Sequence, residues 1–339
     1  MNSLVTGATG FIGMHLIDAL RQHHRSIVVL ARHPEKVSKI WPGTAITVRH
    51  GDLDKAASLK GVCDGVDTVF HLAGCAHDKN DLDPALETRY WHTIVEGTRA
   101  LLREAAEAGV KRFIFVSSVK AMGEGGPDLQ DESSPVTPES AYGRAKLAAE
   151  QAVLDAGRVH GIHTTVLRFP LVYGPGNKGN IPRMIKAIDR GIFPPIPRNG
   201  NRRSMVHVAD VVQALLLAAQ AEAPAQQVYI VTDGVVYSTR DIYDMIRAAM
   251  GLPSRRWSVP LTVLRILGAC GDFIGKVRGM PFVLDSQVLS KLLGSAWYSS
   301  DKITRELGYR PAHTLRDALP AMVAEYQGVK LQAERSLAS

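Results

Sequence analysis

The sequence predicts an α/β fold with a doubly wound parallel sheet and a smaller C-terminal α/β lobe. Three observations predict it. Short apolar, β-branched runs alternate with amphipathic stretches in the first half of the chain, as in βαβ units. A glycine-rich turn directly follows the first of these runs. After Phe169 the composition shifts to proline, glycine and asparagine, which indicates a change of architecture at that residue.

The individual elements follow from periodicity and turn residues. We expect six strands in the first half, at Ser3–Val5, Ser26–Leu30, Ile46–His50, Thr68–Leu72, Arg112–Ser117 and Thr164–Phe169. The clearest helical patterns lie at Phe11–Arg21, Tyr90–Ala108 and Ser140–Ala156. Within the second pattern, one face carries Ile94, Leu101, Leu102 and Ala105.

The second half is expected to contain shorter helices and a lone strand, Val228–Val231. We therefore assign residues 1–169 to a first domain and residues 170–330 mainly to a lobe interleaved with the end of the sheet. Residues 331–339 are expected to fray.

Composition excludes several classes of protein. The 40 Lys and Arg against 33 Asp and Glu leave a formal charge of +7, which suits an anionic ligand but also serves solubility. No basic run is interleaved with aromatic residues, so we expect no nucleic-acid partner. Cys63, Cys75 and Cys270 form no CxxC pair, and the 12 histidines show no HExxH spacing. We therefore expect no metal, no disulfide and a cytoplasmic location.

Two apolar segments could be mistaken for membrane or export signals. Residues 1–13 lack the charged start of a leader peptide and are predicted to form a strand and a turn. Val259–Ile274 is broken by Arg265 and Asp272 and is too short to span a bilayer. We interpret it as an amphipathic helix that caps the second domain or rests on a membrane face.

The glycine-rich turn predicts a dinucleotide site of the Rossmann type. Gly7 permits a tight turn, Gly10 lets the backbone approach a pyrophosphate, and Gly13 lets the helix pack on the strand. The N–H groups at the start of the helix, at Phe11 and Ile12, face the phosphates there. The turn follows a strand and opens an apolar helix, which favours this interpretation over a plain tight turn.

A second pattern, Tyr142-Gly143-Arg144-Ala145-Lys146, predicts acid–base chemistry. A spacing of four places Tyr142 and Lys146 on one face of a helix. A lysine ammonium beside a phenol stabilises the phenolate, so Tyr142 can exchange a proton with a substrate hydroxyl. A surface Tyr–Lys pair is the alternative, and the glycine turn earlier in the chain disfavours it.

Together these segments resemble the extended short-chain dehydrogenases, in particular the NAD-dependent epimerase/dehydratase family with its bacterial nucleotide-sugar 4-epimerases and 4-ketoreductases. Ser118, 24 residues before Tyr142, corresponds to the third catalytic residue of that family. The resemblance also implies cofactor contacts from three other places in the chain. These are Asp52 and Leu53, Leu72-Ala73-Gly74, and Phe169.

The end of the second strand bears on cofactor choice. NAD enzymes usually place an acidic residue there to bind the ribose 2′-hydroxyl, whereas this chain has Ala31 and Arg32. Arg32 can pair with a 2′-phosphate through two hydrogen bonds. We therefore favour NADP over NAD, and the alternative is that Arg32 is a solvated loop residue.

The substrate side also resembles nucleotide-sugar enzymes of surface-polysaccharide pathways. The resemblance implies that Asn180 and Arg203 bind the diphosphate of a UDP-linked sugar, beside Ser118 and Lys120. A solvated basic turn is the alternative for Arg203. Three family positions differ, because Ile94 and Leu171 replace asparagines and no clear arginine precedes Trp297.

The resemblance narrows the chemistry without fixing the reaction. Sugar 4,6-dehydratases carry an Asp-Glu pair after the catalytic hydroxyl residue, where this chain has Val119 and Lys120, so dehydration is rejected. A 4-epimerase and a 4-ketoreductase both remain open. A steroid- or flavonol-type carbonyl reductase and a non-catalytic NADP-sensing protein are the alternatives. The family also implies a homodimer.

Overall fold

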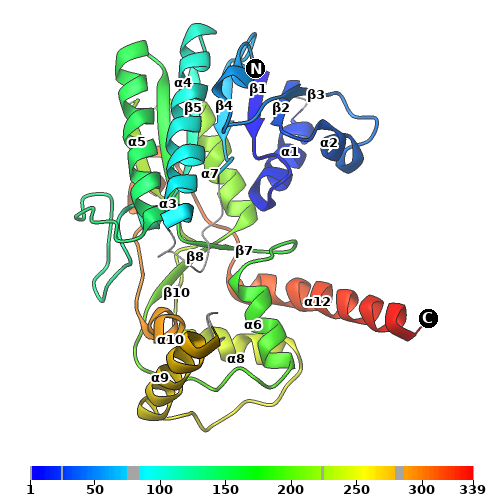
Figure 1. Cartoon of the computed structure of the whole chain (residues 1–339), viewed down its shortest axis with the longest axis vertical. Coiled ribbons are helices and arrows are strands. Elements are labelled where there is room, and N and C mark those ends of the chain that lie inside the picture. Colours follow the sequence, from blue (N-terminus) through cyan, green and yellow to red (C-terminus); the bar gives the residue numbers. More distant parts are fainter. Residues whose placement is uncertain (1, 24–25, 75–83, 223–224, 279–285, 339) are drawn as a thin grey trace.

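A computed structural model describes the chain apart from residues 1, 24–25, 75–83, 223–224, 279–285 and 339 (Figure 1). Its main sheet has seven strands in the order β3-β2-β1-β4-β5-β6-β9. All six pairings between neighbours are parallel. The strands are β1 (Asn2–Thr6), β2 (Ser26–Ala31), β3 (Ile46–His50), β4 (Thr68–His71), β5 (Arg112–Ser118), β6 (His163–Phe169) and β9 (Gln227–Ile230). The doubly wound parallel sheet predicted from the sequence is therefore confirmed.

Helices cover both faces of the sheet, which explains why its central strands are apolar on both sides (Figure 1). One face packs against α1 (Phe11–Gln22) and α7 (Val208–Gln220). The other packs against α4 (Gly97–Glu107) and α5 (Ala141–His160). Near the edge strand β3 lies the short helix α2 (Pro34–Ile40).

The helix predicted at Tyr90–Ala108 is divided into three parts. These are α3 (Pro84–Tyr90), a π-helical turn (Trp91–Glu96) and α4. A π turn inserts one residue into the helical repeat and rotates the face that follows it. At the junction Gly97 lies against Leu53, because a Cβ there would come 2.8 Å from the Leu53 Cβ. The four apolar residues expected on one face of this helix are all buried.

The second half contains more strands than the one expected. The expected strand is β9, which pairs with β6 in the main sheet. A separate sheet in the order β10-β8-β7 contains β7 (Leu171–Tyr173), β8 (Arg203–His207) and β10 (Val236–Tyr237). These strands have three, five and two residues, and β8 also carries charged and polar side chains. Contacts with other elements determine these strands, so the alternation of apolar and polar residues in the sequence does not predict them.

The remaining helices lie in the smaller lobe, at the bottom of Figure 1, or at its junction with the sheet. They are α6 (Asn180–Asp189), α8 (Thr239–Ala249), α9 (Leu261–Arg278), α10 (Ser286–Leu293), α11 (Asp301–Leu307) and α12 (Leu315–Ala338). Single 3₁₀ turns occur at Ala56–Leu59 and Val119–Ala121. None of the helices within the described ranges is long and apolar enough to cross a membrane.

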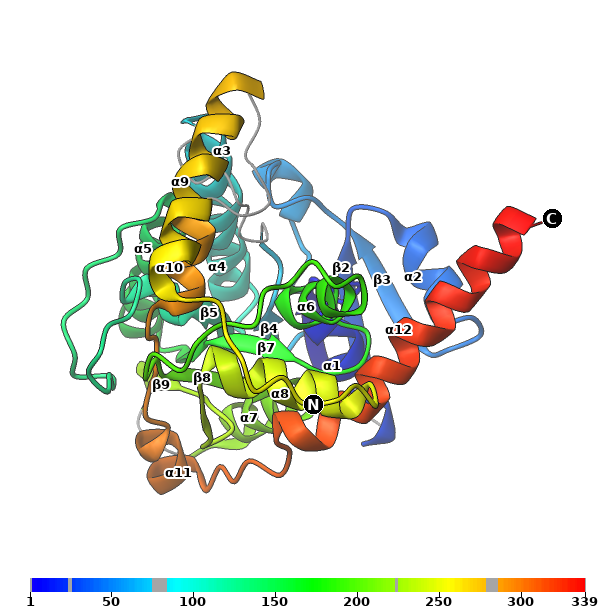
Figure 2. The same cartoon turned by 90° about the horizontal axis from the view of Figure 1, so that it is seen from below.

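The end of the chain continues the last helix. Residues 331–338, expected to fray, continue α12 as it extends away from the lobe (Figures 1 and 2). After Gly328 this stretch has no glycine or proline and is rich in leucine, glutamine, alanine, glutamate and arginine, which favour helix. Of the cysteines, Cys63 is buried and Cys270 exposed, whereas Cys75 lies outside the described residues.

Candidate active site

The glycine turn between β1 and α1 has the geometry that requires glycine. Gly7 adopts φ +72°, and its carbonyl oxygen accepts the Gly10 N–H at 2.9 Å. A Cβ on Gly13 would overlap that same oxygen. No side chain caps α1, because Gly10 occupies the N-cap position. The first-turn N–H groups, including those of Phe11 and Ile12, therefore lack a side-chain acceptor at the place where a pyrophosphate is expected.

A buried histidine connects this turn to the end of β4. His71 Nδ1 lies 2.7 Å from Thr6 Oγ1, and His71 Nε2 lies 2.9 Å from Thr98 Oγ1. Thr6 Oγ1 also accepts the Ala73 N–H at 3.0 Å, and Thr98 donates to the Ile94 carbonyl. With these partners Thr6 donates to Nδ1, and the ring proton lies on Nε2.

Burial and the nearby Lys146 ammonium both favour the neutral form of this ring. They lower the pKa of His71 to about 3. A neutral imidazole with one donor and one acceptor matches both threonines at any physiological pH. The sequence analysis did not single out His71 for this role, because the side chain contributes to the site only through its neighbours.

The segment that His71 holds, Leu72-Ala73-Gly74, lies between the glycine turn and the catalytic helix. A Cβ on Gly7 would come 2.8 Å from the Ala73 nitrogen, and a Cβ on Gly74 would come 3.7 Å from Lys146 Nζ. Three sequence segments predicted to contact one cofactor are therefore adjacent in space.

The N-terminal end of α5 places the Tyr–Lys pair at the carboxyl edge of the sheet. Ser140 caps the helix and accepts the Gly143 N–H at 3.1 Å. Lys146 Nζ donates to the Val116 carbonyl at 2.9 Å and lies 6.0 Å from the centre of the Tyr142 ring. The spacing of four thus brings both side chains to one face, as predicted.

Ser118, the third predicted catalytic residue, is the last residue of β5, two positions after the carbonyl that Lys146 contacts. Its Oγ accepts the Lys120 N–H at 3.2 Å and is partly buried. The structure therefore brings Ser118, Tyr142 and Lys146 to the same edge of the sheet.

Two aromatic residues outside the predicted set complete this edge. The ring of Tyr90 meets that of Tyr142 edge-on at 5.6 Å, and the ring of Phe115 lies 4.7 Å from Lys146 Nζ. Both are fully buried. They restrict where the two functional side chains can lie, and no motif in the sequence identifies them.

The catalytic helix is also attached to the sheet one turn further along. Glu150 follows Lys146 by four residues on the same face and is buried. Its carboxylate accepts hydrogen bonds from the guanidinium of Arg168 on β6, at 2.6 Å from Nη2 and 3.0 Å from Nε. The Ser117 hydroxyl on β5 also donates to it. A buried two-pronged ion pair therefore joins α5 to two neighbouring strands.

The other cofactor candidates lie around this centre with different degrees of exposure. Asp52 follows β3 and is partly buried, and its Oδ1 accepts the Asp54 N–H at 3.2 Å. Phe169 is packed in the core, so only its backbone can face a ligand. Arg32 follows β2 and is exposed, with no ion pair to any residue in the described part of the chain.

The candidate substrate residues come from separate elements. Lys120 forms an ion pair with Glu124. Asn180 is exposed at the first position of α6. Arg203, at the start of β8, donates to the Gly294 carbonyl at 3.1 Å, and burial lowers its pKa. Arg202 next to it stacks on the Trp297 ring at 4.6 Å. Arg203 is partly buried and Arg202 is exposed, and both contact the segment 294–297.

A fourth polar side chain lies near this group. Burial raises the pKa of Tyr298 to about 12, and the nearby Glu124 acts in the same direction while Arg203 opposes it. Glu124 and Arg203 therefore both lie near Tyr298. No motif described above singles out Tyr298.

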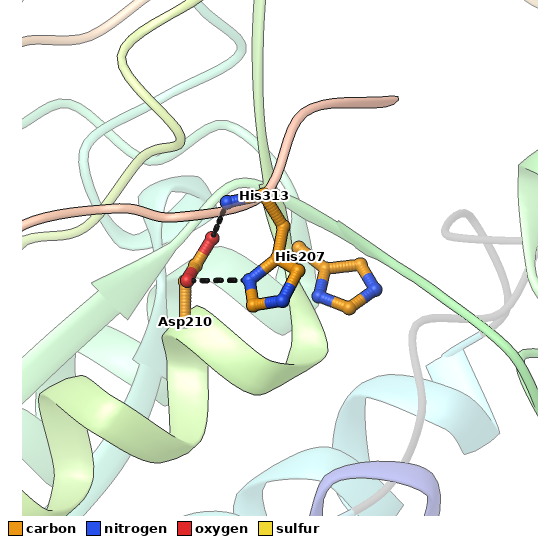
Figure 3. Close-up of side chains that lie close together, drawn as sticks. All are labelled: His207, Asp210 and His313. Carbon is orange, nitrogen blue, oxygen red and sulfur yellow. Dashed lines mark hydrogen bonds and ion pairs between the residues drawn. The ribbon is translucent and has the colours of Figure 1, made fainter. Parts of the chain in front are cut away.

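Within the described residues, one group of histidine and acidic side chains is close enough to hold a metal ion: His207, Asp210 and His313 (Figure 3). Its hydrogen-bonding capacity is largely used within the protein. Asp210 accepts the backbone N–H groups of Ala312 and His313 and also His313 Nδ1, at 3.0–3.1 Å. His207 Nδ1 accepts the Ala209 N–H, and the two imidazoles stack at 4.5 Å. The arrangement fastens the loop before α12 to the start of α7.

A neighbouring buried cluster fastens the same loop to the small sheet. The Asp233 carboxylate accepts the hydroxyl groups of Tyr173 and Tyr237, each at 2.8 Å. The Tyr237 oxygen in turn accepts the Leu315 N–H at 3.0 Å. Burial raises the pKa of Asp233 to about 6, although both tyrosine hydrogen bonds oppose the shift.

Comparisons with known proteins agree with this geometry. The chain is 29% identical over 321 residues to a UDP-glucose 4-epimerase of Vibrio cholerae, covering 93% of this chain and 92% of the relative. It is also 29% identical over 330 residues to a ketoreductase of Stigmatella aurantiaca that acts on 4-hydroxy-2-methyl-3-oxo-4-farnesyl-3,4-dihydroquinoline-1-oxide, covering 95% and 96% of the two chains.

Among solved structures, MoeE5 in complex with UDP-glucose and NAD matches with a TM-score of 0.75 and 27% identity, over 98% of this chain and all of that one. The family model for the NAD dependent epimerase/dehydratase family matches residues 3–232, which include the glycine turn, the Tyr–Lys pair and Arg203. The chain therefore belongs to the NAD dependent epimerase/dehydratase family.

Proposed function

We propose that this protein is an NAD(P)-dependent oxidoreductase that acts at C4 of a nucleotide sugar, as a 4-epimerase or a 4-ketoreductase. The observation that carries the proposal is the placement of Ser118, Tyr142 and Lys146 beside the glycine turn at one edge of the sheet. The similarity to a UDP-glucose 4-epimerase and to a structure with bound UDP-glucose supports the substrate class.

The residues present fit a nicotinamide dinucleotide. The turn at Gly7 and Gly13 leaves no room for a Cβ, and the uncapped first turn of α1 offers its N–H groups to a pyrophosphate. A Cβ on Gly74 would come 3.7 Å from Lys146 Nζ, so the segment that adjoins the glycine turn also adjoins the catalytic helix. When bound, the nicotinamide supplies the hydride acceptor or donor for the reacting carbon.

Each catalytic side chain then has a separate task. Tyr142 takes the proton of the C4 hydroxyl during oxidation and returns it during reduction. Lys146, held by the Val116 carbonyl, keeps a positive charge near the phenolate oxygen and stabilises it. Ser118 donates a hydrogen bond to the reacting oxygen and fixes its orientation.

Dehydration remains excluded from the proposal. Val119 and Lys120 follow Ser118 in the 3₁₀ turn, and Lys120 is already paired with Glu124. No acidic pair therefore adjoins the catalytic hydroxyl in the way that elimination of water from the sugar needs.

For the cofactor we propose NADP over NAD. Arg32 is exposed directly after β2, where its guanidinium can meet a ribose 2′-phosphate, and Ala31 before it presents no negative charge. A preference for the reduced phosphorylated cofactor favours the ketoreductase over the epimerase. We also propose a cytoplasmic homodimer that pairs through α4 and α5.

Titration calorimetry with UDP and UDP-glucose tests the substrate class. If Arg203 meets the diphosphate, Arg203→Ala weakens binding by about 2–5 kcal/mol, because a desolvated phosphate then lacks its partner. The matched control is Arg202→Ala, which removes the neighbouring guanidinium stacked on Trp297. Failure of the unmodified protein to bind either ligand would contradict the nucleotide-sugar assignment.

A carbonyl reductase acting on an apolar substrate is the second candidate. A cavity of about 420 Å³ lies between α9 and α10 and is lined in part by Leu261, Leu289 and Leu293. It also reaches Gly294, whose carbonyl accepts Arg203. The ketoreductase relative, which acts on a farnesylated ring, favours the same alternative. Oxidation of NADPH with a steroid ketone, but not with a UDP-4-keto sugar, would select it.

A further inference from the structure

Helix α9 and the segment before it present an unusual set of exposed apolar side chains. Val263, Ile266 and Leu267 are 42%, 63% and 45% exposed, and Trp257 just before the helix is 54% exposed. Residues three and four positions apart lie on one face of a helix, so the three aliphatic residues form a continuous row. We call these three aliphatic side chains the α9 row.

The opposite face of α9 is already buried. Leu264 is fully buried, and a Cβ on Gly268 would come 3.4 Å from the Leu289 side chain of α10. The helix is therefore apolar on two sides, and the protein itself covers only one of them. A helix that is apolar all round is normally enclosed. We therefore expect another molecule to cover the α9 row.

The charges around the α9 row indicate what that partner is. From Met245 to Gly271 the sequence contains four arginines and no aspartate or glutamate. Arg255 and Arg256, in the segment before the helix, are exposed. Arg265 lines the cavity between α9 and α10 and lies away from the α9 row. The Arg255 guanidinium lies 5.4 Å from the centre of the Trp257 ring. An exposed apolar helix face preceded by a tryptophan and arginines is typical of helices that lie in the interface of an anionic bilayer.

We propose that the α9 row docks this protein on the surface of a membrane that contains anionic lipids. Ile266 and Leu267 enter the boundary between headgroups and acyl chains, while Arg255 and Arg256 contact lipid phosphates. The helix lies along the surface and does not cross the membrane, in agreement with its composition.

A second copy of this chain fits the same surface less well. A twofold contact places the same patch on both subunits, so it would bring the arginines of both copies into one interface. The stretch from Met245 to Gly271 offers no acidic side chain to compensate them. Lipid phosphates supply that negative charge, whereas a second copy does not.

The proposal does not depend on the identity of the sugar, and its test needs no substrate. The full-length protein is sedimented with vesicles of phosphatidylglycerol and phosphatidylcholine, and with vesicles of phosphatidylcholine alone. We expect binding to the anionic vesicles that weakens with salt. The double variant Ile266→Glu, Leu267→Glu lowers the partition coefficient on the order of 100-fold. Arg255→Ser with Arg256→Ser lowers it about 10- to 30-fold.

The matched control is Val329→Glu, which adds a charge at an aliphatic residue of α12 that is 61% exposed. This variant should bind vesicles as the unmodified protein does. Thermal unfolding confirms that each variant is folded, and turnover on a water-soluble nucleotide sugar reports separately on the proposed reaction. Absence of vesicle binding by the unmodified protein overturns the proposal. So does equal loss in the α9 and Val329 variants, or dissociation of a dimer by the α9 variant in sedimentation velocity.

Discussion

Two buried carboxylates in this protein are held by different kinds of partner. Glu150, beneath the catalytic helix, meets the guanidinium of Arg168 through two nitrogens. Asp233, at the junction of the lobe with the loop before α12, meets two tyrosine hydroxyls and the Val235 N–H. The first carboxylate has a permanent countercharge, and the second has only neutral donors.

The charges around Glu150 do not change with pH, whereas those around Asp233 respond to protons. Arginine remains charged at any physiological pH, so the pair beneath α5 keeps Lys146 and Tyr142 in place under all such conditions. At the lobe junction burial opposes the charge on Asp233, and burial also opposes protonation of the nearby His207. We infer that chemistry depends on the first region and attachment of the lobe on the second.

The largest expected effect comes from replacing tyrosine by phenylalanine once in each region. The two variants distinguish a role in chemistry from a role in attaching the lobe. Tyr142→Phe removes the exchangeable proton, so turnover should fall about 10²- to 10⁴-fold with little change in cofactor affinity. Tyr237→Phe removes one donor from Asp233 and should lower the free energy of unfolding by about 1–2 kcal/mol, with turnover retained. Steady-state kinetics and urea unfolding of both variants measure this. Near-normal turnover by the Tyr142 variant would remove that residue from the mechanism.

The next effect concerns stability and uses an isosteric change of each carboxylate. Glu150→Gln leaves the buried Arg168 without its countercharge and should cost about 3–5 kcal/mol. Asp233→Asn removes a charge that burial disfavours and keeps an oxygen for the tyrosines, so near pH 7 it should cost no more than about 1 kcal/mol. Urea unfolding of the two variants compares them directly.

A rescue experiment sharpens this second prediction. Replacing Arg168 by Met in the Glu150→Gln variant removes the uncompensated charge and should restore part of the lost stability. If the double variant is as unstable as the single one, packing and not charge accounts for the role of Glu150.

The sequence predicted the first region better than the second, for a physical reason. The glycine turn and the Tyr–Lys pair depend on residues within one turn of backbone or helix, so their spacing is visible in the sequence. His71, Tyr90 and the Glu150–Arg168 pair act through contacts between distant elements. No local pattern reports such contacts.

The lobe shows the same limitation in its strands. β7, β8 and β10 are too short for an alternating pattern to appear, and Arg203 sits in one of them because of its contacts with the segment 294–297. By contrast, the predicted limits of β3 match the structure, since a five-residue run with β-branched residues pairs with β2 along its whole length.

Cofactor choice gives a smaller effect and should leave both regions unaffected. Because Arg32 is exposed and Ala31 is uncharged, we expect NADPH to bind about 10- to 100-fold more tightly than NADH. Ala31→Asp with Arg32→Asn should reverse that order through repulsion of the 2′-phosphate. Fluorescence titration of both reduced cofactors at fixed ionic strength measures the ratio, and the melting temperature should not change. Equal or tighter NADH binding by the unmodified protein would contradict the NADP preference and would favour an epimerase that retains NAD.

The smallest effect concerns pH, and it arises only in the second region. Burial, with the adjacent His313, lowers the pKa of His207 from 6.5 to about 4, whereas burial raises that of Asp233 from 3.8 to about 6. Between pH 4 and 6.5 the unfolded chain binds more protons at His207, so the stability that His207 contributes is complete above this window and falls as pH falls. Between pH 3.8 and 6 the folded chain binds more protons at Asp233, so the Asp233 contribution is complete below this window and falls as pH rises.

The two contributions to stability therefore change in opposite directions with pH. A variant that removes one titrating group should leave the pH dependence of the other group visible. The stability difference between the unmodified protein and His207→Asn should shrink as pH falls through the window, by on the order of 1–3 kcal/mol. The difference for Asp233→Asn should shrink by a similar amount as pH rises. Val211→Ala, a core change beside Asp210 without a titrating group, should give a difference that is constant with pH. Urea unfolding at several pH values measures all three, and parallel slopes for His207→Asn and Asp233→Asn would show that the lobe junction does not respond to protons in this way.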